Sequence, residues 1–426
     1  MLSSRLPKDL SPSPFFAELE RAKSDVQKDA SAGGLPLIDM TVSSPVRAGL
    51  PVDMDVAVEE ARKDFGCWNP DPAGWMGTRE AVVEYYRERG GIFDAGQIIL
   101  TASTSEAYSV LFKAFCNPGD IILTPMPGYP LLDTLAQLEH LECAPYFLKL
   151  RRENARKLAT DEIYDTRCFS TLVELSPMRR RENLFRFVLD TDSLLSAPEK
   201  AKILLLVSPH NPTGHCVSRT EWNEVVSFCE QHNLILVVDE VFGDYGFSDD
   251  VRRSWTFLAD SKPKCPIFWL NGLSKAVGSP QLKLGWMAFY APEEQFEPIR
   301  AALEFVEDAY LSVSAPAQAL GASLLKQSAA YESSVKERLQ QNWKTLREVF
   351  PSKYCPEVIG GWYAVVRLGE DDEEITLRLL REQHVLVQPG FFFDFDEDGW
   401  VVVSLLQEPS LFKEAVERIL YITRGN

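Results

Sequence analysis

Short apolar runs alternate with helical patterns along the middle of this chain, and this alternation constrains the fold more than any other feature. Each run has the length of one buried strand, and the segment between two runs is long enough for a helix. Strands joined through helices are typical of a mostly parallel sheet. The sequence therefore predicts an α/β fold, with strands at residues 98–100, 121–123, 203–208, 234–239, 267–270 and 284–290.

The sequence becomes helical after Pro298 and then mixes helices with strands. We expect helices at 301–310, 330–349, 375–382 and the C-terminus, and strands at 362–368 and 400–405. This mixture indicates a smaller α+β unit. The expected division is an N-terminal arm with part of the small domain at 1–50, a large domain at 51–310, and a small C-terminal domain at 311–426.

A basic insertion occupies about residues 150–186, with nine Lys or Arg against six Asp or Glu, in a chain whose net charge is −18. We favour a solvated insertion over the alternative, a role in holding an anionic substrate. The overall negative charge argues against a nucleic-acid partner, because phosphate backbones are bound by lysine and arginine.

The sequence also limits the compartment and the cofactor class. No apolar run is long enough to span a bilayer, and Pro7, Pro12 and Pro14 interrupt the N-terminal segment where a secretory signal would lie. We therefore expect a cytoplasmic protein with no membrane partner. The histidines and cysteines do not have metal-ligand spacing, so no metal site is expected.

Lys275 is the first candidate for chemistry, because it follows the strand expected at 267–270. In parallel sheets, ligands bind beyond the carboxyl ends of the strands. A partly desolvated amine there can form an imine with an aldehyde cofactor. A Ser-Lys pair alone says little, since most lysines are solvated surface residues.

Two further motifs also follow predicted strands. Asn211 begins an Asn-Pro-Thr-Gly sequence, which by itself is a turn. Asp239 directly ends an apolar strand, where a helix N-cap is the ordinary interpretation. A carboxylate at that point can also keep a pyridine nitrogen protonated.

The segment after the strand at 98–100 has two interpretations. Ser103 and Glu106 have the spacing of a capping box, which is a sufficient structural explanation. The amides of a helix start, beside the hydroxyls of Ser103, Thr104 and Ser105, also form a phosphate site. Tyr129, in Pro-Gly-Tyr-Pro, can place a ring to stack on a flat cofactor.

In this order, the motifs resemble the class I and II aminotransferases of pyridoxal 5′-phosphate (PLP) fold type I, from about Asp39 to the C-terminus. The resemblance rests on Asn-Pro-Thr-Gly, on Asp239-Glu240, and on Ser274-Lys275 followed by Leu-Lys-Leu-Gly-Trp. It implies a large PLP-binding domain with a mostly parallel seven-stranded sheet, a smaller α+β domain, and a homodimer.

The resemblance also implies a role for each candidate residue. Lys275 forms a Schiff base with PLP and then acts as general acid and base. Asp239 contacts the pyridine nitrogen, Asn211 donates to the ring oxygen, and Tyr129 stacks on the ring. The phosphate is held by Ser103, Thr104, Ser105, Ser274 and Lys283.

The sequence departs from relatives at several positions. Val402 lies where they usually place the arginine that clamps the substrate carboxylate. Arg367 is our candidate substitute, and the Ser43 hydroxyl is a second candidate for that carboxylate. Phe242 and Trp68 each replace a common tyrosine. Lys283 replaces an arginine, which removes its bidentate fork, and Gly272 replaces a serine that contacts the phosphate in relatives.

The leading hypothesis is a PLP-dependent aminotransferase that moves an amino group between an amino acid and a 2-oxo acid. Val402 favours an alternative, a PLP-dependent lyase or an enzyme similar to the aminocyclopropane carboxylate synthases, because the same fold serves all of these reactions. A third hypothesis, a non-catalytic PLP-binding protein, is disfavoured because Lys275 and Asp239 are both retained.

Overall fold

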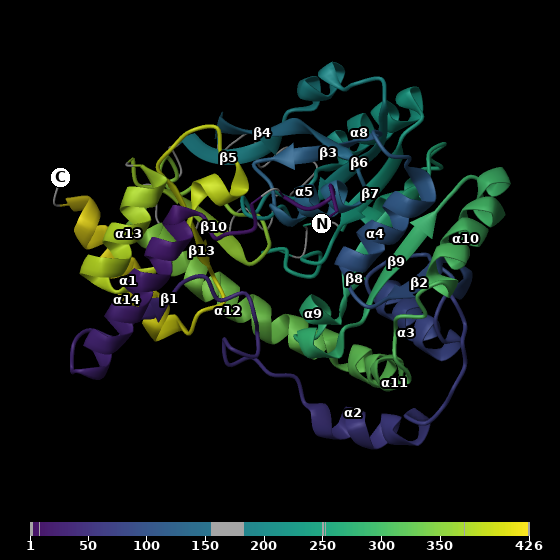
Figure 1. The fold of residues 1–426 in the computed structure, drawn as a ribbon, viewed down its shortest axis with the longest axis horizontal. Coiled ribbons are helices and arrows are strands. Elements are labelled where there is room, and N and C mark those ends of the chain that lie inside the picture. Colours follow the sequence, from purple (N-terminus) through teal and green to yellow (C-terminus); the bar gives the residue numbers. More distant parts are fainter. Residues whose placement is uncertain are drawn as a thin grey trace.

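The computed structural model describes residues 3–7, 9–154, 183–248, 251, 253–369 and 371–424. Its main element is an eight-stranded sheet in the order β2-β9-β8-β7-β6-β3-β4-β5 (Figure 1). β3, β4, β6, β7 and β8 pair in parallel, and β9 is antiparallel to both neighbours. The α/β prediction is confirmed. The strands are β2 (Ile98–Thr101), β3 (Ile121–Met126), β4 (Glu142–Asn154), β5 (Asn183–Leu189), β6 (Ala201–Val207), β7 (Ile235–Asp239), β8 (Ile267–Gly272) and β9 (Gly285–Tyr290).

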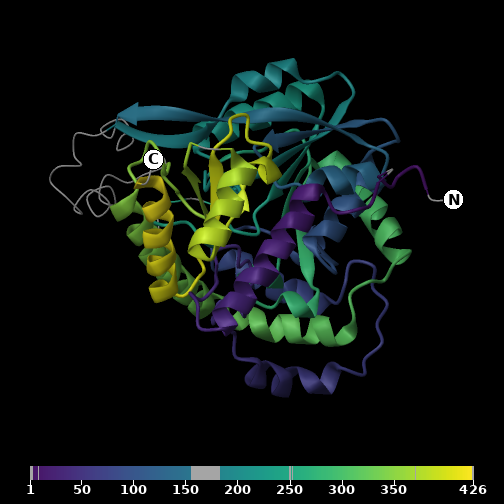
Figure 2. The same ribbon diagram turned by 60° about the vertical axis from the view of Figure 1, so that its left-hand side comes forward.

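The sheet has one strand more than the seven expected. The additional strand is β5, which pairs antiparallel with β4 from Leu148↔Leu189 to Asn154↔Asn183 (Figure 2). The two ends of the basic insertion are therefore strands of the sheet edge. Residues 155–182, which carry most of its charges, lie outside the described residues.

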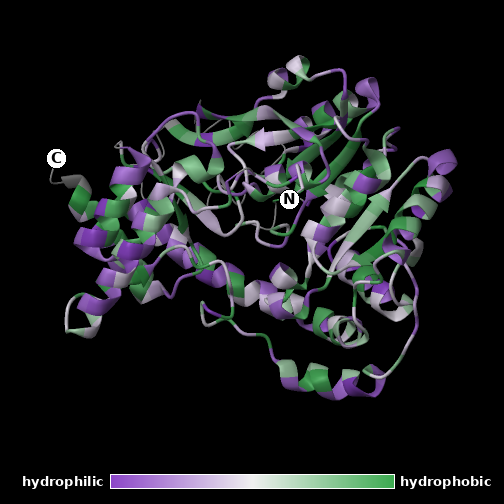
Figure 3. Ribbon diagram, in the orientation of Figure 1, coloured by the Kyte–Doolittle hydropathy of each residue, from purple (hydrophilic) through white to green (hydrophobic). Residues whose placement is uncertain are grey.

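Alternate residues of the central strands enter two separate hydrophobic clusters. Leu204, Leu236 and Trp269 belong to the larger cluster, whereas Leu205 and Val237 belong to the second. This is the consequence of a strand's two-residue side-chain period in a sheet that is covered on both faces. Hydrophobic colour accordingly follows these strands, while the outer helices alternate between the two colours (Figure 3).

Helices cover both faces of the sheet. Those packed in the second cluster include α4 and α10, and those in the larger cluster include α3 and α8. α10 begins at Glu293, earlier than predicted, because Ile299 and Leu303 form a buried face that continues across Pro298. The helices of this part are α2 (Met54–Ala61), α3 (Met76–Arg87), α4 (Thr104–Phe115), α5 (Leu131–Leu138), α8 (Arg219–His232), α9 (Leu273–Ala276), α10 (Glu293–Asp308) and α11 (Ala315–Leu324).

A second group of elements surrounds a three-stranded antiparallel sheet with the order β10-β13-β12. The N-terminal helix packs against α13 in this group (Figure 1). A parallel pair of two-residue strands, β1 (Ile38–Asp39) and β11 (Val385–Leu386), adds a further connection to the N-terminal segment. The other elements are α1 (Pro14–Ser31), α12 (Ser328–Val349), β10 (Tyr363–Arg367), α13 (Asp372–Gln383), β12 (Gln388–Pro389), β13 (Trp400–Ser404) and α14 (Pro409–Arg424).

The N-terminal prolines do not prevent a helix from forming in this segment. Pro14 is the first residue of α1, and Ser13 caps the helix by accepting from the Phe16 backbone N–H. Proline suits this position because its missing N–H has no partner there in any helix. The division of the chain at residues 50 and 310 stays a prediction. Within the described residues, the helices include none that is long and apolar enough to cross a membrane.

Candidate active site

Lys275 lies at the carboxyl end of β8, on the four-residue helix α9. Its Nζ donates to the Ser43 carbonyl at 3.4 Å and lies 4.6 Å from the ring centroid of Trp362 and 5.3 Å from that of Phe242. Burial among these groups lowers the pKa of the Lys275 amine to about 8, against an opposing effect of the Asp239 charge. With this pKa, roughly a tenth of the amine is neutral and nucleophilic at pH 7, far more than for an ordinary lysine.

Asp239 ends β7, the strand beside β8, with Leu270 as its register partner. Its Oδ2 accepts from the Tyr108 hydroxyl at 2.8 Å, and its Oδ1 accepts from the Val241 N–H at 3.1 Å. Burial raises the pKa of this carboxyl, and the two hydrogen bonds and Lys275 oppose that rise. A turn follows Asp239, so the N-cap interpretation does not apply.

Two tyrosines contribute to the surroundings of Asp239. Tyr108 was not among the residues predicted from the sequence, although it lies four residues after Thr104 on α4, which puts both on one helix face. Tyr129, the predicted stacking ring, is 47% exposed. Burial and the Asp239 charge raise the pKa of its hydroxyl, which indicates that the ring and the carboxylate are near each other.

Asn211 follows β6, the other neighbour of β7. Its Oδ1 is buried and has no hydrogen-bond partner among the described residues. A buried amide without a partner is costly, and rotation of the amide presents either its oxygen or its NH₂ to the same neighbour. The side-chain amide of Asn211 is therefore available to a further hydrogen-bond partner at this strand end.

The predicted phosphate segment lies at the start of α4. Ser103 caps this helix by accepting from the Glu106 N–H at 3.2 Å. The Glu106 carboxylate accepts from the Ala102 N–H instead of the Ser103 N–H. Only half of the predicted capping box is therefore formed, and the other half is shifted by one residue.

Close backbone packing brings the start of α4 beside the start of α9. A Cβ on Gly285 would lie 3.1 Å from the Thr104 nitrogen, and one on Gly272 would lie 3.0 Å from the Gly285 Cα. A serine at position 272 would therefore push these segments apart.

The other two predicted phosphate residues flank this region. Ser274 adjoins Lys275 on α9 and is partly buried. Lys283 is exposed and has a left-handed backbone, with φ of 53°. Its ammonium is therefore presented at the surface rather than held in the core.

The structure does not bring Arg367 to Lys275. Arg367 lies five residues beyond Trp362, and five residues of strand span roughly 16 Å. Its guanidinium pairs with Glu397 at 2.6 Å and lies 5.6 Å from the Trp400 ring. Val402 is fully buried in β13, so neither position presents a cation to the lysine.

Trp362 and Tyr363, which sequence reasoning missed, form a wall beside the amine. Both are buried, and the Trp362 indole N–H has no partner among the described residues. The signal for them was the Gly-Gly turn directly before them, at the start of β10. Ser43, whose carbonyl accepts from Lys275, also hydrogen bonds through its side chain to Tyr363, which opposes the burial-driven rise in that tyrosine's pKa.

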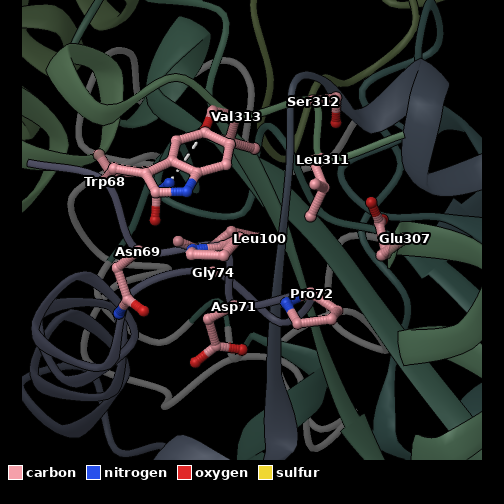
Figure 4. A pocket seen from close by; sticks show the side chains of 12 residues that line it. Trp68, Asn69, Asp71, Pro72, Gly74, Leu100, Glu307, Leu311, Ser312 and Val313 are labelled. Carbon is pink, nitrogen blue, oxygen red and sulfur yellow. Dashed lines mark hydrogen bonds between the residues drawn. The ribbon is translucent and has the colours of Figure 1, made fainter. Parts of the chain in front are cut away.

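A cavity of about 40 Å³ borders β2, the strand that leads into the phosphate segment. Trp68 and Glu307 lie on opposite sides of it, with Leu100 between them (Figure 4). Burial and the Glu106 charge raise the pKa of Glu307 to about 8. In the described part of the chain, no group of three or more His, Cys, Asp or Glu side chains is arranged to hold a metal.

Comparison with known proteins identifies the family. The aminotransferase class I and II family matches residues 69–419. The chain belongs to this family. It is 23% identical to tyrosine aminotransferase of Caenorhabditis elegans, covering 95% of this chain and 84% of the relative. It is also 23% identical to glutamate-pyruvate aminotransferase of Haemophilus influenzae, in a match that covers 91% of this chain and 90% of the relative.

The fold agrees with that of solved aminotransferases. An aminotransferase from Escherichia coli superposes with a TM-score of 0.77 at 20% identity, over 100% of this chain and 98% of that one. The predictions of fold type I and of a transferase are confirmed, and the family to which the chain belongs is PLP-dependent. The lyase, ring-closure and non-catalytic hypotheses are not favoured, because the relatives are aminotransferases.

Proposed function

We propose that this aminotransferase holds PLP through Lys275 and uses the same amine to move a proton during transfer between an amino acid and a 2-oxo acid. The observation that carries the proposal is the geometry at two adjacent strand ends. Lys275, with its pKa lowered to about 8, lies among aromatic rings on β8, and Asp239 ends β7. These are the two groups that the chemistry requires.

The residues around these two groups fit PLP. Asn211 has an unpartnered buried amide for the ring oxygen. Asp239 receives two hydrogen bonds that favour its charged form, which suits contact with a protonated pyridine nitrogen. Tyr129 is the stacking ring, and the phosphate residues are Ser103, Thr104, Ser105, Ser274 and Lys283.

When bound, PLP supplies an electron sink for charge that develops on the substrate carbon. Asp239 favours the protonated pyridine nitrogen on which that sink depends. The Lys275 amine would accept the proton from the substrate carbon and deliver it to the cofactor. The Phe242 and Trp362 rings limit water around the Lys275 amine, which keeps the amine partly neutral for this role.

The test uses the purified full-length protein loaded with PLP. Borohydride reduction should fix PLP to Lys275, as read by peptide mass, and Lys275→Ala should lose the visible absorbance of the loaded protein. Titration with single amino acids should convert the absorbance to that of pyridoxamine phosphate. Retained absorbance in Lys275→Ala would contradict the site, and no conversion by a broad amino-acid panel would contradict transamination.

The proposal leaves the amino acid open, because the relatives are named for different substrates. We propose Ser43 as a substrate contact, since its carbonyl accepts from the Lys275 amine. Arg367 is not proposed as the carboxylate clamp, because its guanidinium pairs with Glu397.

We also propose that the protein is a homodimer. Trp68 is 80% exposed, and Met76, Tyr310 and Leu311 add further exposed apolar surface. Trp68 and Leu311 line one cavity beside the strand leading to the phosphate segment, so a partner seated there would adjoin that segment. Exposed apolar groups gathered in one region are typical of an interaction surface.

The cytoplasm remains the proposed compartment. The seven cysteines within the described residues are all free thiols: Cys67, Cys116, Cys143, Cys216, Cys229, Cys265 and Cys355. Free thiols are usual in reducing compartments.

A further inference from the structure

A buried ion network adjoins the strand that leads to Lys275. At its centre, the Asp244 carboxylate accepts from Arg89 Nε at 2.9 Å and from the Tyr85 hydroxyl at 2.7 Å. The side chains of Arg89 and Asp244 are 4% and 2% exposed. Charges this deeply buried depend on their partners, so their positions are tightly specified.

The network extends to α12. Glu332 accepts from Arg89 at 3.1 Å, from Arg253 at 2.9 Å and from Lys336 at 2.7 Å. Arg89 also donates to the Ser328 hydroxyl at 3.1 Å. The Arg89 guanidinium is therefore fixed from two sides, by the segment at Asp244 and by the first turns of α12.

One path of hydrogen bonds leads from the network to the helix of Lys275. Asn271 Nδ2 donates to the Tyr85 hydroxyl oxygen at 3.1 Å, and Asn271 Oδ1 accepts from the Gly272 N–H at 2.7 Å. Gly272 is the last residue of β8 and the N-cap of α9. The Tyr85 hydroxyl thus connects the Asp244 carboxylate to the strand end that carries Lys275.

A second path comes from the residue next to Asp244. The fully buried Tyr245 donates from its hydroxyl to the Lys275 carbonyl at 2.5 Å. α9 has four residues and cannot be stable as an isolated helix. Both ends of α9 are therefore held from the segment that contains Asp244 and Tyr245. Asp244 acts on the start of α9 through Tyr85 and Asn271, and Tyr245 binds the Lys275 carbonyl near its end.

We propose that Tyr85 and Tyr245 are positioning residues that transmit the fixed geometry of the Arg89–Asp244 pair to Lys275. They hold the lysine amine against the Trp362 ring, out of water, without touching cofactor or substrate. The proposal rests on the proposed role of Lys275. The groups that face the amine are the Phe242 and Trp362 rings, the Ser43 carbonyl and, as the charge acting on it, Asp239.

The test measures the basicity of Lys275 directly. The full-length chain, freed of PLP, is labelled with acetic anhydride across a pH series, and acetylation of Lys275 is followed by peptide mass spectrometry. Tyr85→Phe breaks the connection between Asp244 and Asn271. Water should then reach the amine, and the labelling midpoint should rise by about half a pH unit or more, toward the ordinary lysine value. Tyr245→Phe should shift it in the same direction.

Tyr86→Phe is the matched control. Tyr86 is also fully buried, and its hydroxyl accepts from Trp286 Nε1 at 3.1 Å. Its loss removes an equivalent buried hydroxyl without touching Asn271, so the labelling midpoint should stay at the wild-type value even if the melting temperature falls. An unchanged midpoint in Tyr85→Phe, or an equal shift in Tyr86→Phe, would overturn the proposal.

The labelling is done without PLP, so its result is independent of the proposed function. Failure of the protein to take up PLP would reject the function and leave the labelling shift interpretable. Loading of wild-type and Tyr85→Phe protein with PLP gives a second readout. Slower loading of Tyr85→Phe at neutral pH should accompany the raised pKa, since less of the amine is neutral.

Discussion

At the scale of single residues, the two oxygens of Asp239 have separate partners. Oδ2 accepts from Tyr108 and Oδ1 from the Val241 N–H. Burial raises the pKa of Asp239, and both hydrogen bonds oppose this rise because they favour the charged carboxylate. The charge that the proposed chemistry needs therefore depends on a tyrosine from the neighbouring helix α4.

Tyr108→Phe should weaken that charge. Loss of one hydrogen bond, worth about 1 kcal/mol, should raise the Asp239 pKa by roughly 0.7 of a unit. The acid limb of the pH profile of kcat/KM should move upward by a similar amount. Tyr146→Phe is the control, because Tyr146 is equally buried but donates to the Leu205 carbonyl at 2.7 Å. An unmoved acid limb in Tyr108→Phe would contradict this assignment.

The pH dependence of PLP loading follows from the Lys275 amine, whose pKa burial lowers to about 8. The neutral amine reacts, so the loading rate should level off above pH 8 and fall about tenfold per unit below it. Rapid-mixing absorbance measures this rate. In Asp239→Asn the midpoint of the loading-rate profile should fall to a lower pH, since the Asp239 charge raises the Lys275 pKa. A midpoint near the ordinary lysine pKa in the native protein would contradict the burial of the amine.

At the scale of elements, the site depends on how closely β8, β9 and α4 approach one another. Gly272 and Gly285 make this possible, because neither has a Cβ in the way. The phosphate candidates come from two segments that are distant in sequence: Ser103, Thr104 and Ser105 from one, and Ser274 and Lys283 from the other. Backbone packing at Gly285 brings the two segments together.

Gly285→Ala should separate these elements. Its Cβ would lie 3.0 Å from the Ser103 carbonyl carbon and 3.1 Å from the Thr104 nitrogen. Overpacking of this kind costs about 1–3 kcal/mol, and PLP affinity should fall with it. Urea unfolding and PLP titration measure the two effects. Gly77→Ala is the control, since no atom lies within 4 Å of its added Cβ, and it should leave both quantities unchanged or slightly improved.

At the scale of the whole molecule, two exposed apolar side chains, Trp68 and Leu311, line one cavity. The same region borders β2, which leads into the start of α4. Assembly and the cofactor site are therefore expected to be linked in this protein. The link would make dimerisation a requirement for a complete phosphate site.

Trp68→Asp should weaken self-association. A tryptophan at the centre of an interface commonly contributes about 2 kcal/mol or more, which corresponds to a rise of at least about thirtyfold in the dimer Kd. Sedimentation equilibrium measures this change. Leu195→Asp is the control, because Leu195 is 78% exposed against 80% for Trp68 but lies beyond β5. An equal effect of both substitutions would indicate a general loss of folding rather than a lost interface.

The sequence by itself determined the central strands, the family and the candidate residues at the strand ends. It could do so because buried parallel strands are continuous apolar runs and because the residues that follow them lie at one edge of the sheet. Asp239 and Lys275 were placed in this way, each directly after its own strand. Local periodicity also predicted α12 and β13 within two residues.

Only the tertiary structure decided which side chains meet around those residues. Tyr108, Trp362 and the Tyr85 network reach the site from distant segments. A local pattern can indicate which way such a side chain faces, but it does not determine which groups that side chain contacts. Arg367 was a reasonable candidate by sequence, but strand length and the Glu397 carboxylate hold it away from Lys275. Periodicity reports which face of an element is buried, whereas packing between elements decides what that face touches.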